Sequence, residues 1–260
     1  MRYNKEIMFE AHGTTDIGLK RQRNEDYLVV NKELGLFVVA DGMGGHNAGD
    51  TASMTAAVAI ESFFQRSEQD RELTWPFGID PRLSFDGNRL RTSMKLANQK
   101  VWQLADSKNE YRGMGTTVVC VHARDDIATV GSVGDSRAYL VRNRRIRLLT
   151  RDDIWLNETW VRRTFSSEQL DKMPLKNVLS KAVGSKEDIE FPVQEIHLRD
   201  KDLILLCSDG LHGLVNNDDI AASAAGHPDD LKDLCGDLIV KANQAGGKDN
   251  ITVAALRYRE

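Results

Sequence analysis

The stretch "VADGMGGHNAGDTAS", residues 39–53, begins with the end of an apolar run, which is followed by Asp41. Four of the next eight residues, 42–49, are glycine, and a helix-like pattern begins after them. A carboxylate at the mouth of a buried strand is costly to desolvate unless it is paired, hydrogen-bonded or bound to a cation. Glycine permits a close approach of backbone that side chains obstruct. The stretch therefore predicts a strand that ends at an acidic residue, a glycine-rich loop with accessible backbone, and then a helix.

Composition limits the classes of protein that this chain can represent. Its 260 residues, 41% hydrophobic and 28% charged, are enough for a substantial core. The net charge of -4, from 35 basic and 39 acidic residues, gives no electrostatic reason to bind nucleic acid or an anionic membrane. No internal repeat or linker divides the sequence, so we expect one domain over residues 1–260, acting as a monomer.

The cysteines and the first residues bear on the cellular compartment. Cys120, Cys207 and Cys235 are odd in number and lack a CxxC spacing, which predicts buried thiols in a reducing compartment. Residues 1–12 lack the apolar core of a signal peptide, and no apolar run approaches the roughly 20 residues of a membrane span. We therefore expect a cytoplasmic protein without a membrane partner.

Short apolar runs alternate with helical periodicities along the chain. Helices are predicted over 50–66, on Met54, Ala57, Val58 and Phe64, over 88–107, and from Pro228 to a stop at Gly246. The strands occur in hairpin-like succession, which favours antiparallel sheets with helices packed outside, an α+β fold. Strands are predicted over 27–30, 36–40, 116–121, 127–134, 138–142, 145–149, 203–207 and 251–256, with a turn at Asn143-Arg144.

Acidic residues recur at the ends of these runs. Asp41, Asp135 and Asp209 each end an apolar run, Asp249 precedes one, and the pair Glu25-Asp26 introduces another. Any one of them alone is better explained as a turn residue. As a set, oxygen ligands without a cluster of His or Cys suit magnesium, manganese(II) or calcium rather than zinc.

Eight motifs in order carry a resemblance to a known family. The sequence resembles the type 2C (PPM family) metal-dependent protein serine/threonine phosphatases, in their bacterial branch, from about residue 13 to 256. This resemblance implies a four-layer α/β/β/α sandwich of two antiparallel sheets flanked by helices. The motifs are "RQRNED" (21–26), "VADGMGGHNAG" (39–49), "GMGTTVV" (113–119), "VGDSRAYL" (133–140), "LLTRDD" (148–153), "NVLSKAVG" (177–184), "LCSDGL" (206–211) and "KDNITV" (248–253).

The resemblance implies a set of metal ligands for two manganese(II) or magnesium ions. Asp41 matches the aspartate that bridges both ions, and the carbonyl of Gly42 matches a further ligand. Asp209 and Asp249 match ligands of the first ion, and Glu25 matches the acid on the side of the second. The implied reaction is hydrolysis of phosphoserine and phosphothreonine in proteins by a water activated at this two-metal centre.

Three more residues receive roles from the same resemblance. Asp26 matches the residue that orients metal-bound water, and Asp135 matches the ligand of an additional, weaker metal site. Arg21 matches the arginine that holds the substrate phosphate, a task that suits its planar fork. The implied partners are phosphoproteins and a cognate bacterial serine/threonine kinase, which the enzyme opposes.

The sequence departs from the family pattern in two places. Met43 stands where many relatives have a histidine assigned as general acid, and His46 nearby is better explained as structural. Asp153 replaces a histidine of bacterial relatives at the start of the expected flap, about residues 150–176. Trp155 and Trp160 fall in that segment, where packing and substrate contact are equally consistent with the sequence.

Two other classes of function are consistent with parts of the pattern. A catalytically inactive relative could bind a phosphoprotein or kinase as a regulator, although the intact acidic set argues against it. A calcium-binding structural domain would need several ligands in one short loop, and the sequence has no such loop.

Overall fold

The computed structural model describes residues 8–44, 48–70, 73–158, 161, 164–165 and 178–260. Its centre is two stacked sheets in which every paired strand is antiparallel. One sheet has the order β1 (Met8–Asp16), β11 (Ile251–Arg259), β10 (Leu203–Cys207), β7 (Arg137–Arg142) and β8 (Arg145–Leu148). The other has the order β2 (Asp26–Asn31), β3 (Leu36–Met43), β5 (Val118–Arg124), β6 (Ile127–Val133) and β9 (Val193–His197), and β4 (Gly115–Thr116) pairs with β3.

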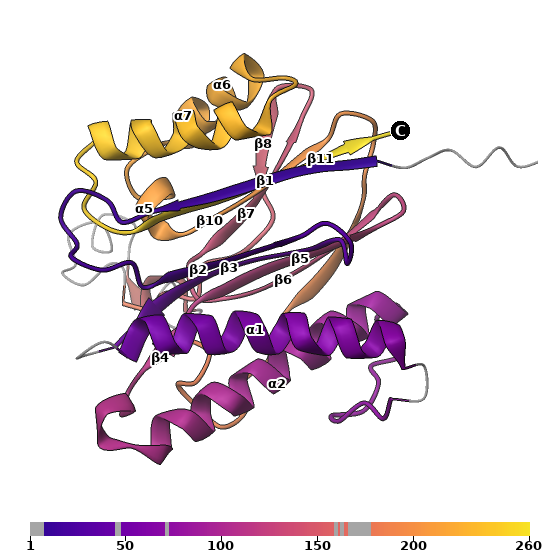
Figure 1. Cartoon of the computed structure of the whole chain (residues 1–260), viewed down its shortest axis with the longest axis vertical. Helices are drawn as coiled ribbons and strands as arrows, with labels where there is room; N and C mark the ends of the chain where they lie inside the picture. The colour runs from indigo at the N-terminus through magenta and orange to yellow at the C-terminus, as the bar shows by residue number, and fades with distance from the viewer. Residues whose placement is uncertain (1–7, 45–47, 71–72, 159–160, 162–163, 166–177) are drawn as a thin grey trace, which may run out of the picture.

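Helices cover the outer face of each sheet, so the molecule has four layers (Figure 1). The β2-containing sheet is covered by α1 (Ala48–Gln69) and α2 (Phe85–Ser107). The β1-containing sheet is covered by α6 (Asn217–Gly226) and α7 (Leu231–Gln244), with the short α5 (Asp209–His212) below them. Two single 3-10 turns complete the described elements, η1 (Asn109–Tyr111) and η2 (Trp155–Asn157). The expected four-layer α/β/β/α sandwich is confirmed.

The side-chain alternation of β3 explains why both of its faces are buried. Leu36, Val38 and Ala40 pack into the core beneath α1 and α2. Phe37 and Val39 point the other way, into the core between the two sheets. Because successive side chains of a strand face opposite sides, a continuous apolar run is what a strand between two covered layers requires.

Local signals of the sequence placed some elements correctly and others wrongly. Asn143 and Arg144 have φ angles of 52° and 61°, the left-handed pair of a tight hairpin turn between β7 and β8, as predicted. The helix expected to open at Pro228 instead begins at Leu231, because the Asp230 carboxylate caps it by accepting from the amides of Lys232 and Asp233.

Of the four residues predicted to form the buried face of the first helix, two are buried and two are exposed. Ala57 and Phe64 are fully buried, but Met54 and Val58 are 47% and 41% exposed. The sheet is contacted instead by small residues such as Ala52 and Ala56, which let the helix lie close to β3. The three cysteines are free and buried, as predicted. None of the helices in the described ranges has the length and apolar character of a membrane span.

Candidate metal centre

The strand ends that carry the acidic residues meet at one edge of the two sheets. Asp41 lies near the end of β3, directly opposite Asp26 in the β2–β3 register. Asp209 is the first residue of α5, and Asp249 lies two residues before β11. Burial raises the pKa of Asp41 well above its usual range, and the charges of Asp26, Asp209, Asp249 and Asp135 raise it further. The structure thus gathers carboxylates that the sequence spreads over more than 200 residues.

Asp26 is held by hydroxyl groups from the other sheet. Its Oδ2 accepts hydrogen bonds from Ser208 Oγ at 2.8 Å and from Thr252 Oγ1 at 2.6 Å. Its Oδ1 is buried without a hydrogen-bond partner among the described residues. Burial is the main cause that raises the pKa of Asp26 to about 6, against the lowering effect of the two hydroxyls. Sequence analysis assigned no role to Ser208 or Thr252, although both lie inside quoted motifs.

Asp209 faces Asp41 across this edge. Burial raises the pKa of Asp209, and the charge of Asp249 adds to the rise, whereas a hydrogen bond with Asp41 opposes it. The Oδ1 atom of Asp209 is buried and has no hydrogen-bond partner in the described part of the chain. The backbone of Asp41 is fixed because its carbonyl accepts from Thr116 Oγ1 at 2.8 Å and from the Thr117 amide at 2.9 Å.

Two glycines of the quoted stretch bring three segments into van der Waals contact. A Cβ at Gly42 would lie 2.0 Å from the Gly49 carbonyl oxygen, and one at Gly49 would lie 2.6 Å from Glu25 Oε1. The Gly42 amide donates to the Glu25 carbonyl at 3.1 Å. Side chains at either glycine would separate β3 from α1 and from Glu25. Gly45 lies outside the described residues.

Arg21 lies among the acidic residues. Its Nη2 is 2.7 Å from Asp249 Oδ2, and its Nη1 is 3.9 Å from Glu25 Oε2. The hydrogen bond to Asp249 is the main cause that raises the pKa of Arg21, and burial raises the pKa of Glu25. About half of the Arg21 side chain is exposed, so the guanidinium can reach an anion that approaches from solvent.

Asn250 joins the chain segments that carry these groups. Its Oδ1 accepts from the Glu25 amide at 2.8 Å, and its Nδ2 donates to the carbonyls of Ile17 at 3.0 Å and Arg23 at 2.9 Å. The side chain is buried. Asn250 lies inside the motif "KDNITV", but its structural role is visible only from these long-range hydrogen bonds.

Asp135 lies at the margin of the cluster, in the loop between β6 and β7. Burial raises its pKa to about 7, with further contributions from the charges of Asp209 and Asp152. The ring of His212 in α5 lies with Nε2 3.0 Å from the Asp135 carbonyl oxygen. His212 is a neighbour of the site that sequence analysis did not single out.

The donor set fits hard divalent cations. No group of three or more His, Cys, Asp or Glu side chains in the described ranges is already close enough together to hold a metal ion. The candidate donors nevertheless all offer oxygen, and within the described ranges the buried Oδ1 atoms of Asp26 and Asp209 have no hydrogen-bond partner; magnesium and manganese(II) bind such oxygen atoms.

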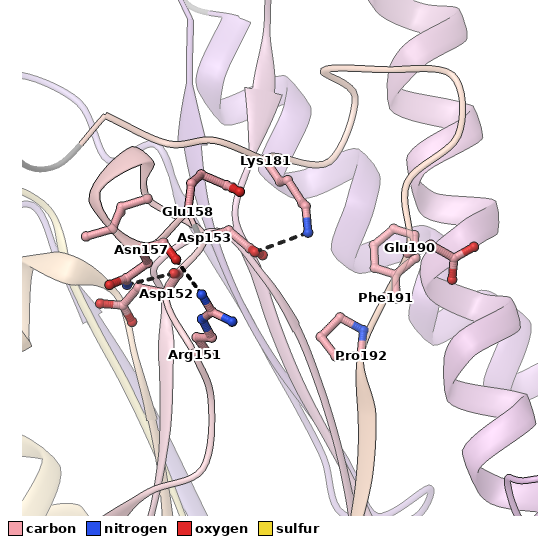
Figure 2. A pocket seen from close by; sticks show the side chains of 10 residues that line it. Arg151, Asp152, Asp153, Asn157, Glu158, Lys181, Glu190, Phe191 and Pro192 are labelled. Carbon is pink, nitrogen blue, oxygen red and sulfur yellow. Dashed lines mark hydrogen bonds and ion pairs between the residues drawn. The ribbon is translucent and has the colours of Figure 1, made fainter. Parts of the chain in front are cut away.

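The first part of the expected flap lies beside the acidic cluster. The Asp153 amide donates to the Gly134 carbonyl at 2.8 Å, one residue before Asp135. Asp153 Oδ1 is 3.5 Å from Lys181 Nζ, an ion pair on the wall of a cavity of about 520 Å³ that Phe191 and Pro192 line from the opposite side (Figure 2). Burial raises the pKa of Asp153.

The remaining residues of interest are partly described. The amide of Trp155, in η2, donates to the Val178 carbonyl at 2.8 Å. Met43 lies opposite Gly115 in the β3–β4 register, and a Cβ at that glycine would be 3.1 Å from Met43 Cε. Trp160 and His46 lie outside the described residues, so their predicted roles stay predictions.

Comparison with known proteins is consistent over nearly the whole chain. A family model described as Protein phosphatase 2C matches residues 19–236. Protein phosphatase PhpP of Streptococcus pneumoniae is 33% identical over 253 residues, which cover 95% of this chain and 96% of PhpP. The solved structure of the Streptococcus agalactiae serine/threonine phosphatase is 32% identical, with a TM-score of 0.82 over 97% of this chain and 100% of that chain.

A second solved structure contains metal. The catalytic domain of the serine/threonine protein phosphatase PstP, in complex with two manganese ions, is 25% identical. Its TM-score is 0.79 over 98% of this chain and 100% of that chain. The fold, the acidic edge and these similarities define the class of the molecule, which is a protein serine/threonine phosphatase. The chain belongs to the protein phosphatase 2C family.

Proposed function

We propose that this phosphatase hydrolyses phosphoserine and phosphothreonine in proteins at a centre of two manganese(II) or magnesium ions. The observation that carries the proposal is the convergence of buried carboxylates, with unpartnered oxygen atoms, at one edge of the two sheets. The two manganese ions in the related PstP domain support it. Asp41, the Gly42 carbonyl, Asp209, Asp249 and Glu25 would hold the ions. Asp135 would contribute to an additional, weaker site.

When bound, the ions would activate a water for attack on phosphorus and neutralise developing negative charge. Asp26 is suited to orient that water, because Ser208 and Thr252 fix one of its oxygens and leave the other unpartnered. Arg21 is suited to hold the phosphate, since its partly exposed guanidinium already lies between Asp249 and Glu25. No covalent phospho-enzyme is required by this arrangement.

The presence of Met43 limits which group can protonate the leaving oxygen. Its thioether carries no proton and packs on Gly115, so it cannot protonate the departing serine or threonine oxygen. We infer that solvent supplies this proton. The wider role would be to reverse the action of a bacterial serine/threonine kinase on shared phosphoproteins.

The decisive experiment measures hydrolysis of a small aryl phosphate with and without manganese, together with manganese binding by calorimetry. Turnover should vanish in a chelator and return with manganese or magnesium. Asp41→Asn should lower both manganese affinity and turnover by at least 100-fold, because a ligand of both ions is lost. Arg21→Ala should leave manganese affinity within about threefold and lower kcat/KM by roughly 10- to 100-fold, which corresponds to the loss of a charged phosphate contact.

Three outcomes would contradict the proposal. Full turnover in metal-free buffer would exclude the metal-dependent reaction. Normal manganese affinity in Asp41→Asn would exclude the bridging role of this residue. An absence of phosphate release with every metal tested would favour the alternative of an inactive, regulatory relative.

A further inference from the structure

A second cavity lies at the far end of the strand that leads away from the acidic cluster. It has a volume of about 390 Å³. Figure 1 shows the end of β11, marked C, on the opposite side of the molecule from α5 and β4. The cavity is formed by the β7–β8 turn, the end of α6 and the last residues of β11, and we call it the distal basic pocket; its charged lining residues are Arg144, Lys201, Asp229, Arg257 and Arg259.

The distal basic pocket carries an excess of positive charge. Four of its lining side chains are cationic and one, Asp229, is anionic. Glu10 is not a lining residue, but it lies directly opposite Arg257 in the β1–β11 register and adds a second negative charge next to the pocket. Both carboxylates are already paired with Arg259, whose Nη2 is 2.8 Å from Asp229 Oδ1 and whose Nε is 3.4 Å from Glu10 Oε1. Two positive charges therefore remain uncompensated.

Arg257 is a buried cation, and its burial is energetically unfavourable when no anion is bound in the pocket. Its side chain is buried, with a residue exposure of only 4%, and its guanidinium donates to the carbonyls of Pro228 and His227. These bonds tether the α6–α7 connection, which is a structural role, but neutral carbonyls leave the charge in place. No carboxylate of the described residues lies within ion-pair distance of Arg257. Burial lowers its pKa, as does the charge of Arg259, whereas the charges of Glu10 and Asp229 oppose this effect.

The two exposed cations are placed by unusual backbone conformations. Arg144 has a φ of 61° and Lys201 a φ of 68°, in a region that non-glycine residues seldom adopt. The Lys201 amide is fixed by donating to the Tyr258 carbonyl at 2.9 Å. Both side chains line the pocket and are exposed, and within the described part of the chain neither forms an ion pair or hydrogen bond, although the charge of Lys201 acts on Asp229.

We propose that the distal basic pocket binds a phosphate dianion, either as free phosphate or as the monoester of a phosphorylated side chain. Such a group carries a charge of about -1.5 to -2 near pH 7 and three acceptor oxygens, which matches two uncompensated cations. The guanidinium groups provide planar donor forks for these oxygens. Asp249 and Arg257 are separated by roughly 26 Å along an extended strand, so this anion is not the phosphate undergoing hydrolysis.

The test is calorimetric titration of metal-depleted, dialysed full-length protein with inorganic phosphate, against chloride at matched ionic strength. The test variant is Arg144→Ala/Lys201→Ala, which removes two exposed cations that form no side-chain hydrogen bond or ion pair among the described residues. The matched control is Arg145→Ala/Arg147→Ala, an equal charge change on the same hairpin outside the pocket. A second arm uses a phosphoserine peptide and its unphosphorylated form, which separates a side-chain source of the anion from a free one.

We expect the native protein and the control variant to bind the phosphate probe equally, and the test variant to bind it at least tenfold more weakly. Binding of the phosphopeptide alone would assign the pocket to phosphorylated side chains. Equal affinity of the native protein and the test variant for both probes, or an equal response to chloride, would overturn the proposal. All variants should keep native turnover of an aryl phosphate with manganese, so failure here is distinct from failure of the proposed reaction.

Discussion

Among single residues, Asn250 shows how one buried amide can order an otherwise irregular region. The segments around Ile17, Arg23 and Glu25 form no regular pairing with one another, yet each gives a backbone group to the Asn250 side chain. A buried side chain that makes three hydrogen bonds is satisfied almost completely. The position of Glu25, and with it that side of the proposed metal centre, therefore depends on this amide.

Replacement of Asn250 by Ala should lower the free energy of unfolding by about 3 kcal/mol, because three buried backbone groups lose their partner. Urea denaturation measures this change. Calorimetry should also show weaker manganese binding, since Glu25 loses its anchor. Asn217→Ala, at an exposed position in α6, is the matched control and should change stability by no more than about 0.5 kcal/mol. Unchanged manganese affinity in a destabilised Asn250→Ala would mean that this residue does not position Glu25.

Among the elements, the segment that begins the flap is attached to the core by backbone bonds as well as by the ion pairs of Asp152 with Arg137 and of Asp153 with Lys181. Asp153 bonds to Gly134, Trp155 bonds to Val178, and Ile154 forms an isolated bridge with Leu179. These contacts hold the segment beside the loop that carries Asp135. A contact between this segment and a substrate can therefore be tested by replacing single side chains, because these backbone bonds remain when a side chain is shortened.

Trp155→Ala should lower turnover of a phosphoprotein about fivefold or more, and turnover of a small aryl phosphate less than twofold. The reason is that an aromatic ring gives a large contact area at low entropic cost, whereas the aryl phosphate is too short to reach the segment. Steady-state kinetics on the two substrates provides the measurement. Trp102→Ala, on the outer helix α2, serves as control. Equal losses on both substrates, with a lower melting temperature, would identify Trp155 as a packing residue.

The strands also show which parts of the fold the sequence pattern could not predict. Apolar runs located the central strands, but β1 ("MFEAHGTTD") and β9 ("VQEIH") mix polar and apolar residues and were not predicted. A strand with one face toward solvent carries a weaker apolar signal than one between two layers. Likewise, the recurrence of acids at strand ends indicated the site. Asn250, Ser208 and Thr252 lie inside the same motifs, but they act through long-range contacts that only the fold creates.

For the whole molecule, the buried histidines contribute to the response to acid. His122 lies in the core beside Phe64, and burial, reinforced by the charges of Arg124 and Arg89, lowers its pKa to about 3. In the unfolded chain its pKa is about 6.5. Protonation therefore favours the unfolded state, so the stabilisation is fully present above pH 6.5 and is lost as pH falls below that value.

The slope of stability against pH should be less steep in His122→Gln than in the native protein, by as much as about 1.4 kcal/mol per pH unit between pH 6 and 4.5. Urea denaturation at several pH values measures both slopes. Carboxyl groups of the acidic edge, such as Asp26 with a pKa of about 6, act in the opposite direction but contribute equally to both proteins. Parallel curves would show that His122 does not titrate on unfolding.

The pairing of β1 with β11 links residues near the two ends of the sequence, Met8 with Arg259 through Asp16 with Ile251. During translation, β1 is made first and must wait for β11, which also supplies the pairing partner of β10. Asp249 and Asn250 emerge just before that strand, so the acidic edge is complete only when the sheet can close. A nascent chain on the ribosome is therefore expected to be inactive toward the phosphoproteins around it until β11 has been synthesised and has paired with β1.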